Sequence, residues 1–149
     1  MIQFSVVIPL YNKANYIQNC LESVLKQTHK EFEVILVNDG STDGSETVVE
    51  RFQDSRIRLV HQENKGASAA RNKGISLAKH EWIALIDADD YWYPNHLEEL
   101  QNTIEQFPKA DAVCNNYEIL LEKDYVKHPT FSIEYPLKLN TSKIILKGV

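Results

Sequence analysis

Four apolar runs of strand length alternate with helical patterns between residues 4 and 107 of this chain. The runs are 4–8, 33–37, 56–60 and 82–86, and Val, Ile and Leu dominate them. Such composition is typical of strands buried on both faces of a parallel sheet. Helical spacing of apolar residues follows the runs, in 17–25, 43–52, 67–78 and 97–107. The repeat predicts an α/β fold, an open and mostly parallel sheet with helices on both faces.

Smaller signals refine this outline. Ala70 and Gly74 give the third helix a face of small residues, which lets that helix lie close to the sheet. Pro94 suits the first turn of the fourth helix. A further strand is expected at 112–116, and 119–126 is either a strand pair or an irregular excursion. Residues 142–147 could form a short helix or a strand.

Bulk composition limits the classes of protein. The 149 residues suit one domain with a sizeable core, and a net charge of −5 argues against a nucleic-acid partner bound by charge. Cys20 and Cys114 lack metal-ligand spacing, so free thiols in a reducing compartment are expected. We find neither an apolar stretch approaching 18 residues nor a signal peptide, which predicts a cytoplasmic location.

The fourth apolar run ends abruptly in Asp87, Asp89 and Asp90. Ligands of open α/β sheets bind at the carboxyl ends of the strands. Crowded carboxylates repel one another, and a hard divalent cation relieves that repulsion. Magnesium sites with one or two carboxylates usually share the ion with substrate phosphates, so these residues predict a metal-bridged phosphate ligand. The structural alternative is that Asp89 or Asp90 caps the helix that starts near Pro94.

Polar groups also follow the other three runs. They are Pro9-Leu10-Tyr11-Asn12, then 38–43 (NDGSTD), then 62–66 (QENKG) leading into Arg71. A parallel sheet would bring all four clusters to one edge. This convergence carries more weight than any single motif.

Residue chemistry indicates roles at that edge. Tyr11 offers a flat face for a nucleobase, and an ionised Asp39 could accept the N3–H of uracil. The alternative for Asp39 and Asp43 is that they shape the turn and cap the second helix, which we favour for Asp43. Arg71 could reach a base or phosphate with its forked donors, or form a surface ion pair.

Roles for the three aspartates follow from the same reasoning. Asp87 could hydrogen-bond a ribose hydroxyl, Asp89 could bind the metal, and Asp90 best suits a cap or a supporting position. Other site types lack support, because the sequence has no zinc-type histidine spacing, P-loop, G-x-S-x-G or G-x-G-x-x-G. Trp82 and Trp92 are expected to be packing residues.

Four blocks together resemble family 2 glycosyltransferases, which have the GT-A fold, a Rossmann-like α/β architecture. The blocks are 5–12 (SVVIPLYN), 37–43 (VNDGSTD), 64–72 (NKGASAARN) and 85–90 (LIDADD), in the family's order and spacing. The resemblance covers roughly residues 4–118. It implies inverting transfer of a sugar from a nucleotide sugar, usually UDP-linked, with Mn²⁺ or Mg²⁺ on the diphosphate.

The resemblance also implies a set of site residues. The metal would contact Asp89 and offset charge on the departing diphosphate, while a general base helps an acceptor hydroxyl to attack the anomeric carbon from the opposite side. The nucleotide would contact Pro9, Tyr11, Asp39, Arg71, Asp87 and Ala88.

Departures from the family pattern lie towards the C-terminus. Family members continue into a half that carries the catalytic base and the acceptor site, and Glu118, Glu122 and Asp124 do not match the context of that base. We therefore expect a nucleotide-sugar-binding domain in 1–118 and the incomplete start of an acceptor region in 119–149. The acceptor would be a glycan, a lipid-linked or another hydroxyl compound, as in polysaccharide biosynthesis, and further C-terminal sequence could associate with the inner face of a membrane.

Two other functions stay open at this point. The chain could be a non-catalytic nucleotide-sugar-binding or assembly module that kept the fold without the chemistry. It could instead be another α/β enzyme that uses aspartates and magnesium, such as a nucleotidyltransferase, although the 38–41 turn and the Arg71 block do not support that class.

Overall fold

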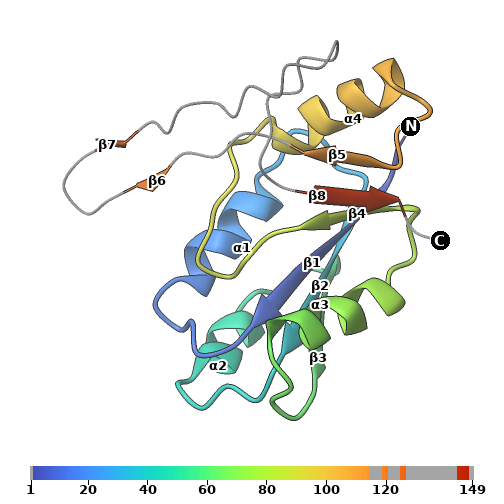
Figure 1. Cartoon of the computed structure of the whole chain (residues 1–149). Coiled ribbons are helices and arrows are strands. Elements are labelled where there is room, and N and C mark those ends of the chain that lie inside the picture. The colour runs from blue at the N-terminus through green and yellow to red at the C-terminus, as the bar shows by residue number, and fades with distance from the viewer. Residues whose placement is uncertain (1, 115–118, 121–124, 127–143, 148–149) are drawn as a thin grey trace.

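A six-stranded sheet forms the centre of the computed structural model (Figure 1), which describes residues 2–114, 119–120, 125–126 and 144–147. The strand order is β3-β2-β1-β4-β8-β5. The strands of this sheet are β1 (Phe4–Leu10), β2 (Phe32–Asn38), β3 (Ile57–His61), β4 (Trp82–Leu85), β5 (Ala112–Cys114) and β8 (Ile144–Lys147). The helices are α1 (Ile17–Leu25), α2 (Ser45–Glu50), α3 (Ala67–Ser76) and α4 (His96–Gln106). A separate antiparallel pair consists of β6 (Ile119–Leu120) and β7 (Tyr125–Val126).

The first four strands are parallel, as the sequence predicted. β1 pairs with β2 on one side and with β4 on the other, and β2 pairs with β3. The carboxyl ends of β1, β2, β3 and β4 therefore meet at one edge of the sheet. β8 lies antiparallel between β4 and β5, which confirms the strand alternative for 142–147. The pairing of β6 with β7 likewise confirms the strand-pair alternative for 119–126.

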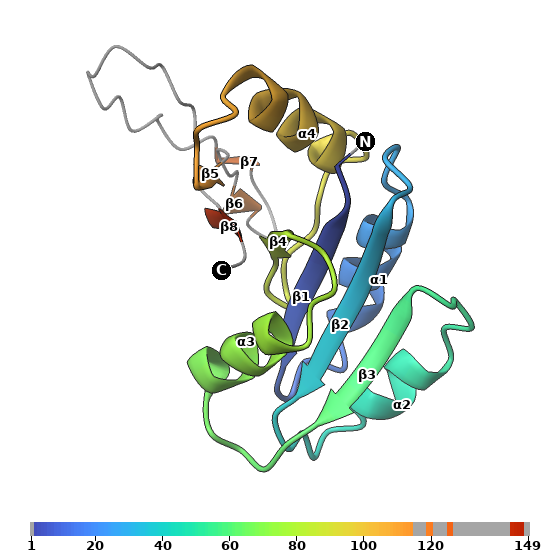
Figure 2. The ribbon, with the colours of Figure 1, turned by 90° about the vertical axis from the view of Figure 1, so that its right-hand side faces the viewer.

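Helices cover both faces of the sheet (Figure 2), and the strand sequences show why. Successive side chains of a strand point to opposite faces. Phe4, Val6 and Ile8 of β1 pack in one core cluster with residues of α1, α2 and α4. Val7 packs in a second cluster with Ala70 of α3 on the other face. The expected two-sided architecture is confirmed.

The helix α3 lies very close to β1, as its small residues predicted. A Cβ added at Gly74 would lie 2.3 Å from Cγ1 of Val7 and 3.4 Å from Cγ2 of Val37. Any larger side chain at this position would push the helix away from the sheet. The close approach brings Arg71, one turn earlier in α3, to the edge where β4 ends.

The start of α4 differs from our expectation. Its N-cap is Asn95, so Pro94 lies before the first turn, and neither Asp89 nor Asp90 caps this helix. The reason is two hydrogen bonds from Gln27, which lies just after the end of α1. Gln27 accepts the N–H of Leu97 at 2.9 Å and donates to the carbonyl of Tyr93 at 2.7 Å. These bonds hold 93–97 against the residue that follows α1, and the aspartates remain outside α4.

Two further details correct or limit the sequence analysis. β3 is not buried on both faces, because it is an edge strand of the sheet, and its Arg58 is exposed. The strand expected at 112–116 is present as β5, and residues 115–116 lie outside the described residues. Trp82 and Trp92 are buried, as expected for packing residues. Among the described residues, no helix has the length and apolarity needed to cross a membrane.

Candidate functional site

The loops that follow β1 and β2 are joined at the carboxyl edge of the sheet. Asn12 has a left-handed backbone (φ 50°), a conformation that Asn tolerates better than most residues. Its N–H donates to Ser41 Oγ at 3.1 Å, and its Oδ1 accepts the N–H of Thr42 at 2.8 Å. This anchoring fixes the position of Tyr11, a residue that is 47% exposed and so accessible to a ligand.

Asp43 supports this junction. Its carboxylate accepts the N–H of Ser45, the first residue of α2, at 3.0 Å, and the N–H of Ala14 at 2.9 Å. Burial would raise the pKa of Asp43, but these bonds, together with that from the Ser45 hydroxyl, lower it below its ordinary value. This geometry agrees with the structural interpretation, in which Asp43 supports the start of α2.

Asp39 is a buried carboxylate held by the loop that follows β3. Its Oδ1 accepts Gln62 Nε2 at 2.7 Å and the N–H of Lys65 at 2.8 Å, and its Oδ2 accepts the N–H of Gly66 at 2.8 Å. Gly66 presents that N–H from a backbone with φ 88°, which favours glycine. Burial alone would raise the pKa of Asp39, but these donors lower it overall, so the carboxylate is ionised at neutral pH.

An ion pair links α3 to the end of β4. Arg71 Nη2 lies 2.6 Å from Asp87 Oδ1, and both side chains are partly exposed. The ion pair expected as the structural alternative for Arg71 therefore exists, and its partner is another residue of the predicted site. A guanidinium has five N–H donors, so Arg71 can bind a ligand without releasing Asp87.

A second ion pair links the loop after β1 to the same segment. Lys13 Nζ lies 2.7 Å from Asp89 Oδ2, and the Asp89 side chain is 42% exposed. The hydrogen bond to Asp89 raises the pKa of Lys13 above its ordinary value, against the opposing effect of partial burial. The N–H of Lys13 donates to Ser45 Oγ at 2.8 Å, which fixes the backbone from which this ammonium reaches Asp89.

The remaining predicted residues lie at the same edge with different accessibility. Pro9 is half-buried in β1, beyond the last β1–β4 pair at Val7, where its missing N–H costs no bond to β4. Ala88 is buried in the core, so its backbone rather than its methyl group could meet a nucleotide. The N–H of Asp90 donates to the carbonyl of Asp87 at 3.0 Å and closes a turn around Ala88 and Asp89.

Sequence reasoning missed two contributors. Lys13 follows the cluster after β1 directly, and its opposite charge to the 87–90 cluster was the available signal. Gln62 belonged to the cluster after β3, but no pattern indicated that its amide would bind Asp39. Both contacts join residues far apart in the sequence, and they depend on the loop geometry described above.

The carboxylates of this edge fit a divalent cation that is shared with a ligand. Within the described part of the chain, no three His, Cys, Asp or Glu side chains gather closely enough to hold an ion by themselves. Asp89 is accessible and already lies against a cation, the ammonium of Lys13. Magnesium and similar ions often take one or two carboxylates and complete their shell with phosphate oxygens and water. The carboxylates of this edge could therefore hold a metal ion only together with a phosphate ligand.

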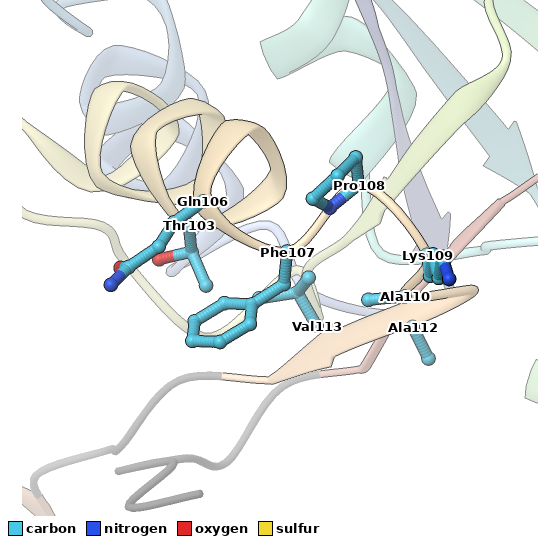
Figure 3. Close-up of a pocket in the computed structure, with 8 residues that line it drawn as sticks. All are labelled: Thr103, Gln106, Phe107, Pro108, Lys109, Ala110, Ala112 and Val113. Carbon is cyan, nitrogen blue, oxygen red and sulfur yellow. The ribbon is translucent and has the colours of Figure 1, made fainter.

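A separate pocket of about 450 Å³ is lined by the end of α4, the start of β5 and the residues that connect them (Figure 3). Phe107, Pro108 and Val113 contribute to a mainly apolar wall. None of its lining residues belongs to the predicted site, and the wall lacks the convergent charged groups found at the carboxyl edge. We therefore do not regard this pocket as the donor site.

Comparison with known proteins gives an independent view of the chain. The family model described as Glycosyl transferase family 2 matches residues 5–147. The glycosyltransferase GlyG of Streptococcus pneumoniae is 44% identical over 138 residues, which are 87% of this chain and 46% of GlyG. The chain thus spans less than half the length of this relative.

Solved structures resemble the fold as well. TarS 1–349 of S. aureus has a TM-score of 0.81 and 26% identity, over 99% of this chain and 47% of TarS 1–349. TarS 1–349 has also been solved with UDP-GlcNAc and with UDP. The mannosyltransferase PcManGT of Pyrobaculum calidifontis, solved with GDP-Man and Mn²⁺, has a TM-score of 0.68 and 28% identity, over 77% of this chain and 36% of PcManGT.

Proposed function

Because this chain belongs to Glycosyl transferase family 2, we propose that the carboxyl edge of its sheet binds the nucleotide sugar of a glycosyl transfer reaction. The expected GT-A fold is confirmed by the α/β sheet and by its solved neighbours. We propose a UDP-sugar as the donor, since TarS 1–349 binds UDP-GlcNAc and UDP. Two ion pairs carry the proposal, Arg71–Asp87 and Lys13–Asp89. They bring segments that are far apart in the sequence together at the carboxyl edge of the sheet.

The nucleoside would lie between the loops after β1 and β2. The exposed ring of Tyr11 offers its face to the base, and Asp39 offers a carboxylate oxygen to an N–H of the base. An ionised carboxylate has about four acceptor positions, and the loop 62–66 occupies three of them here. One acceptor position of Oδ2 therefore remains for the N3–H of uracil. Asp87 would bind a ribose hydroxyl with one carboxylate oxygen, while its other oxygen, Oδ1, accepts the hydrogen bond from Arg71.

The diphosphate would lie over Lys13, Arg71 and Asp89, where two cationic side chains meet the edge. Asp89, with phosphate oxygens, would hold Mn²⁺ or Mg²⁺, as the Mn²⁺ complex of PcManGT supports by analogy. When bound, such an ion neutralises charge that develops on the departing diphosphate. The two cationic side chains add positive charge to the same region and orient the diphosphate before transfer.

The chemistry of transfer would be inverting and metal-dependent, as the family resemblance implied. An acceptor hydroxyl would attack the anomeric carbon from the side opposite the diphosphate, with a general base that we do not assign to any residue of this chain. The division into a donor-binding part, 1–118, and an acceptor part that begins at 119–149 stays a prediction. A cytoplasmic location stays a prediction as well, and so, separately, does association of further C-terminal sequence with the inner face of a membrane; fractionation of a tagged protein checks both.

Calorimetry with UDP, with and without Mn²⁺, tests the donor site. We expect Mn²⁺ to strengthen UDP binding at least about tenfold in the native chain, or about 1.4 kcal/mol. Asp89→Ala should abolish this gain. Asp54→Ala is the matched control, because Asp54 also forms an ion pair but lies before the amino end of β3, away from the carboxyl edge. If Mn²⁺ and Asp89→Ala both leave UDP binding unchanged, the metal role of Asp89 is wrong.

The other functions predict different results in assays of donor turnover and nucleotide preference. A non-catalytic module would bind UDP-sugar but neither hydrolyse it nor transfer its sugar, which chromatography of the incubated donor measures. A nucleotidyltransferase would bind UTP in clear preference to UDP-sugar. Either result would redirect the proposal while leaving the fold and the family unaffected.

A further inference from the structure

The loop that connects β3 to α3 crosses the carboxyl end of β2, where Asp39 lies (Figure 2). It takes this path because β3 is an edge strand, whereas α3 packs on β1 and β2 through Gly74. The loop begins at Gln62, whose N–H donates to the carbonyl of Asn38 at 2.9 Å. The half-buried side chain of Gln62 therefore starts from a backbone that is fixed to β2 beside Asp39.

The two carboxylate oxygens of Asp39 are occupied unequally. A carboxylate oxygen has about two acceptor positions. Oδ1 accepts the amide of Gln62 at 2.7 Å and the N–H of Lys65 at 2.8 Å, so both of its positions are filled. Oδ2 accepts the N–H of Gly66 at 2.8 Å, which leaves one position open. Gln62 is the side chain that closes the second position of Oδ1.

This inequality matters because nucleobases present different numbers of donors to a carboxylate. The Watson–Crick edge of uracil has one donor, N3–H, with a carbonyl oxygen on either side. The same edge of guanine has two neighbouring donors, N1–H and the N2 amino group, which can pair with both oxygens of one carboxylate. A carboxylate with a single open position therefore fits uracil. One that is open at both oxygens also fits guanine.

The other features of the proposed nucleoside site do not select between these bases. TarS 1–349 was solved with UDP and PcManGT with GDP-Man, so the shared fold accommodates either base in those proteins. The face of Tyr11 does not discriminate, because every base has a flat face that stacks on an aromatic ring. The hydrogen bonds at Asp39 are the feature whose fit differs between uracil and guanine.

We infer that Gln62 makes the donor site selective for uracil over guanine, by filling Oδ1 of Asp39 and leaving the base a single acceptor position. Gln62 acts through Asp39 and is a positioning residue. Because the base must meet Asp39, this selectivity rests on the proposed function. Without the Gln62 amide, each oxygen would have one open position, and guanine could use both. Uracil would gain no contact, since its carbonyl oxygens repel a second carboxylate oxygen.

Calorimetry of the 149-residue chain with UDP and with GDP, each with Mn²⁺, tests this selectivity. We expect the native chain to bind UDP at least about tenfold more tightly than GDP. Gln62→Met keeps a side chain of similar size but removes the donor, and it should lower this ratio at least about fivefold. The ratio is informative because a general loosening of the loop would weaken both nucleotides equally.

Gln101→Met is the matched control. The amide of Gln101, also half-buried, donates to the carboxylate of Glu105 at 2.9 Å. Both residues lie in α4, which contributes no residue to the proposed site. We expect this variant to leave the ratio of UDP to GDP affinity unchanged.

NMR of the native chain gives a second test that does not depend on the folding of a variant. The side-chain NH₂ of Gln62 gives a pair of ¹⁵N–¹H resonances, which triple-resonance spectra assign. We expect the proton bonded to Asp39 to stay downfield of the free-amide position when UDP and Mn²⁺ saturate the site. Its return to the free-amide position would show that Gln62 leaves Asp39 when the base binds, which would overturn the inference.

The outcomes also separate this selectivity from the donor-site proposal. If neither nucleotide binds the native chain, the donor site fails and the selectivity fails with it. If UDP and GDP bind equally tightly, the selectivity is wrong and the donor site stands. If Gln62→Met weakens both nucleotides by the same factor, Gln62 only supports the fold of the loop, and its role in selecting the base is wrong.

Discussion

Asp39 shows how one residue combines burial with a fixed charge. The residue is 2% exposed, and its carboxylate accepts hydrogen bonds from three N–H groups of the loop 62–66. An asparagine in its place would turn an NH₂ group towards these donors. We expect Asp39→Asn to lower the free energy of unfolding by about 1–3 kcal/mol at pH 7, the usual cost of unsatisfied buried polar groups. Urea unfolding measures this, with Asp111→Asn, an exposed aspartate, as the control.

The same variant has a defined pH dependence. The pKa of Asp39 is lower in the folded chain than its ordinary value, so its ionised form stabilises the fold above the unfolded pKa of about 3.9. That contribution is lost as pH falls through the lower, folded pKa. The difference in unfolding free energy between the native chain and Asp39→Asn should therefore shrink between pH 6 and pH 2.5. An equal difference at both pH values would contradict the account of this carboxylate.

Substitution of Arg71 can distinguish a structural ion pair from a role in ligand binding. Exposed ion pairs contribute about 0–1 kcal/mol, and the Arg71–Asp87 pair is about one-third to one-half exposed. We expect Arg71→Ala to change the unfolding free energy by less than about 1 kcal/mol and to weaken UDP at least about tenfold. Arg56→Ala, which breaks the Arg56–Asp54 pair away from this edge, should leave UDP affinity unchanged. Equal effects of both variants on UDP would make Arg71 a structural residue only.

At the residue scale, candidate site residues could be predicted from the sequence because they directly follow predicted strands. Tyr11, Asp39 and Asp89 could be selected because a chemically distinct side chain follows an apolar run. Lys13 could not be assigned a partner, since its contact with Asp89 spans 76 residues and depends on the left-handed turn at Asn12. Such long-range contacts require the loop conformations that local patterns do not specify.

Among the elements, α3 has the tightest fit. The missing Cβ of Gly74 leaves space for Val7 Cγ1, which would lie 2.3 Å from it. Alanine would add about 1 kcal/mol of helix propensity but force the helix or Val7 to move. We expect Gly74→Ala to lower the unfolding free energy by about 1–3 kcal/mol. In a Val7→Ala background the same change should be neutral or stabilising, which a double-mutant cycle by urea unfolding checks. Additive costs would show that this contact does not limit the helix.

Element identity was predictable where the apolar pattern was long. The four parallel strands and the four helices follow from runs and spacing that repeat at regular intervals, and their observed ends differ by a few residues. The place of β8 was not predictable. Four residues, Ile144–Lys147, pair with both β4 and β5 in an antiparallel direction, and an isolated short run does not specify its neighbours. The late start of α4 depended likewise on Gln27, a residue of a different segment.

For the whole molecule, β8 raises a question about the predicted boundary at residue 118. A chain that ends at 118 would lose the strand that pairs with β4 and with β5. The backbone groups of β4 and β5 that pair with β8 would be left without these partners. We expect its melting temperature to fall by at least about 5 °C relative to the 149-residue chain. Calorimetry measures this, and an unchanged melting temperature would show that 1–118 is an autonomous domain.

A crystal structure of the chain with UDP and Mn²⁺ tests the central claim, that the carboxyl edge of the sheet is a metal-assisted nucleotide-sugar site. The account predicts an anomalous Mn²⁺ peak about 2.1 Å from an Asp89 carboxylate oxygen, bridged to the diphosphate. It also predicts the uracil ring against Tyr11, with its N3 within hydrogen-bond distance of Asp39. A nucleotide bound away from this edge, or a manganese ion that does not contact Asp89, would contradict it.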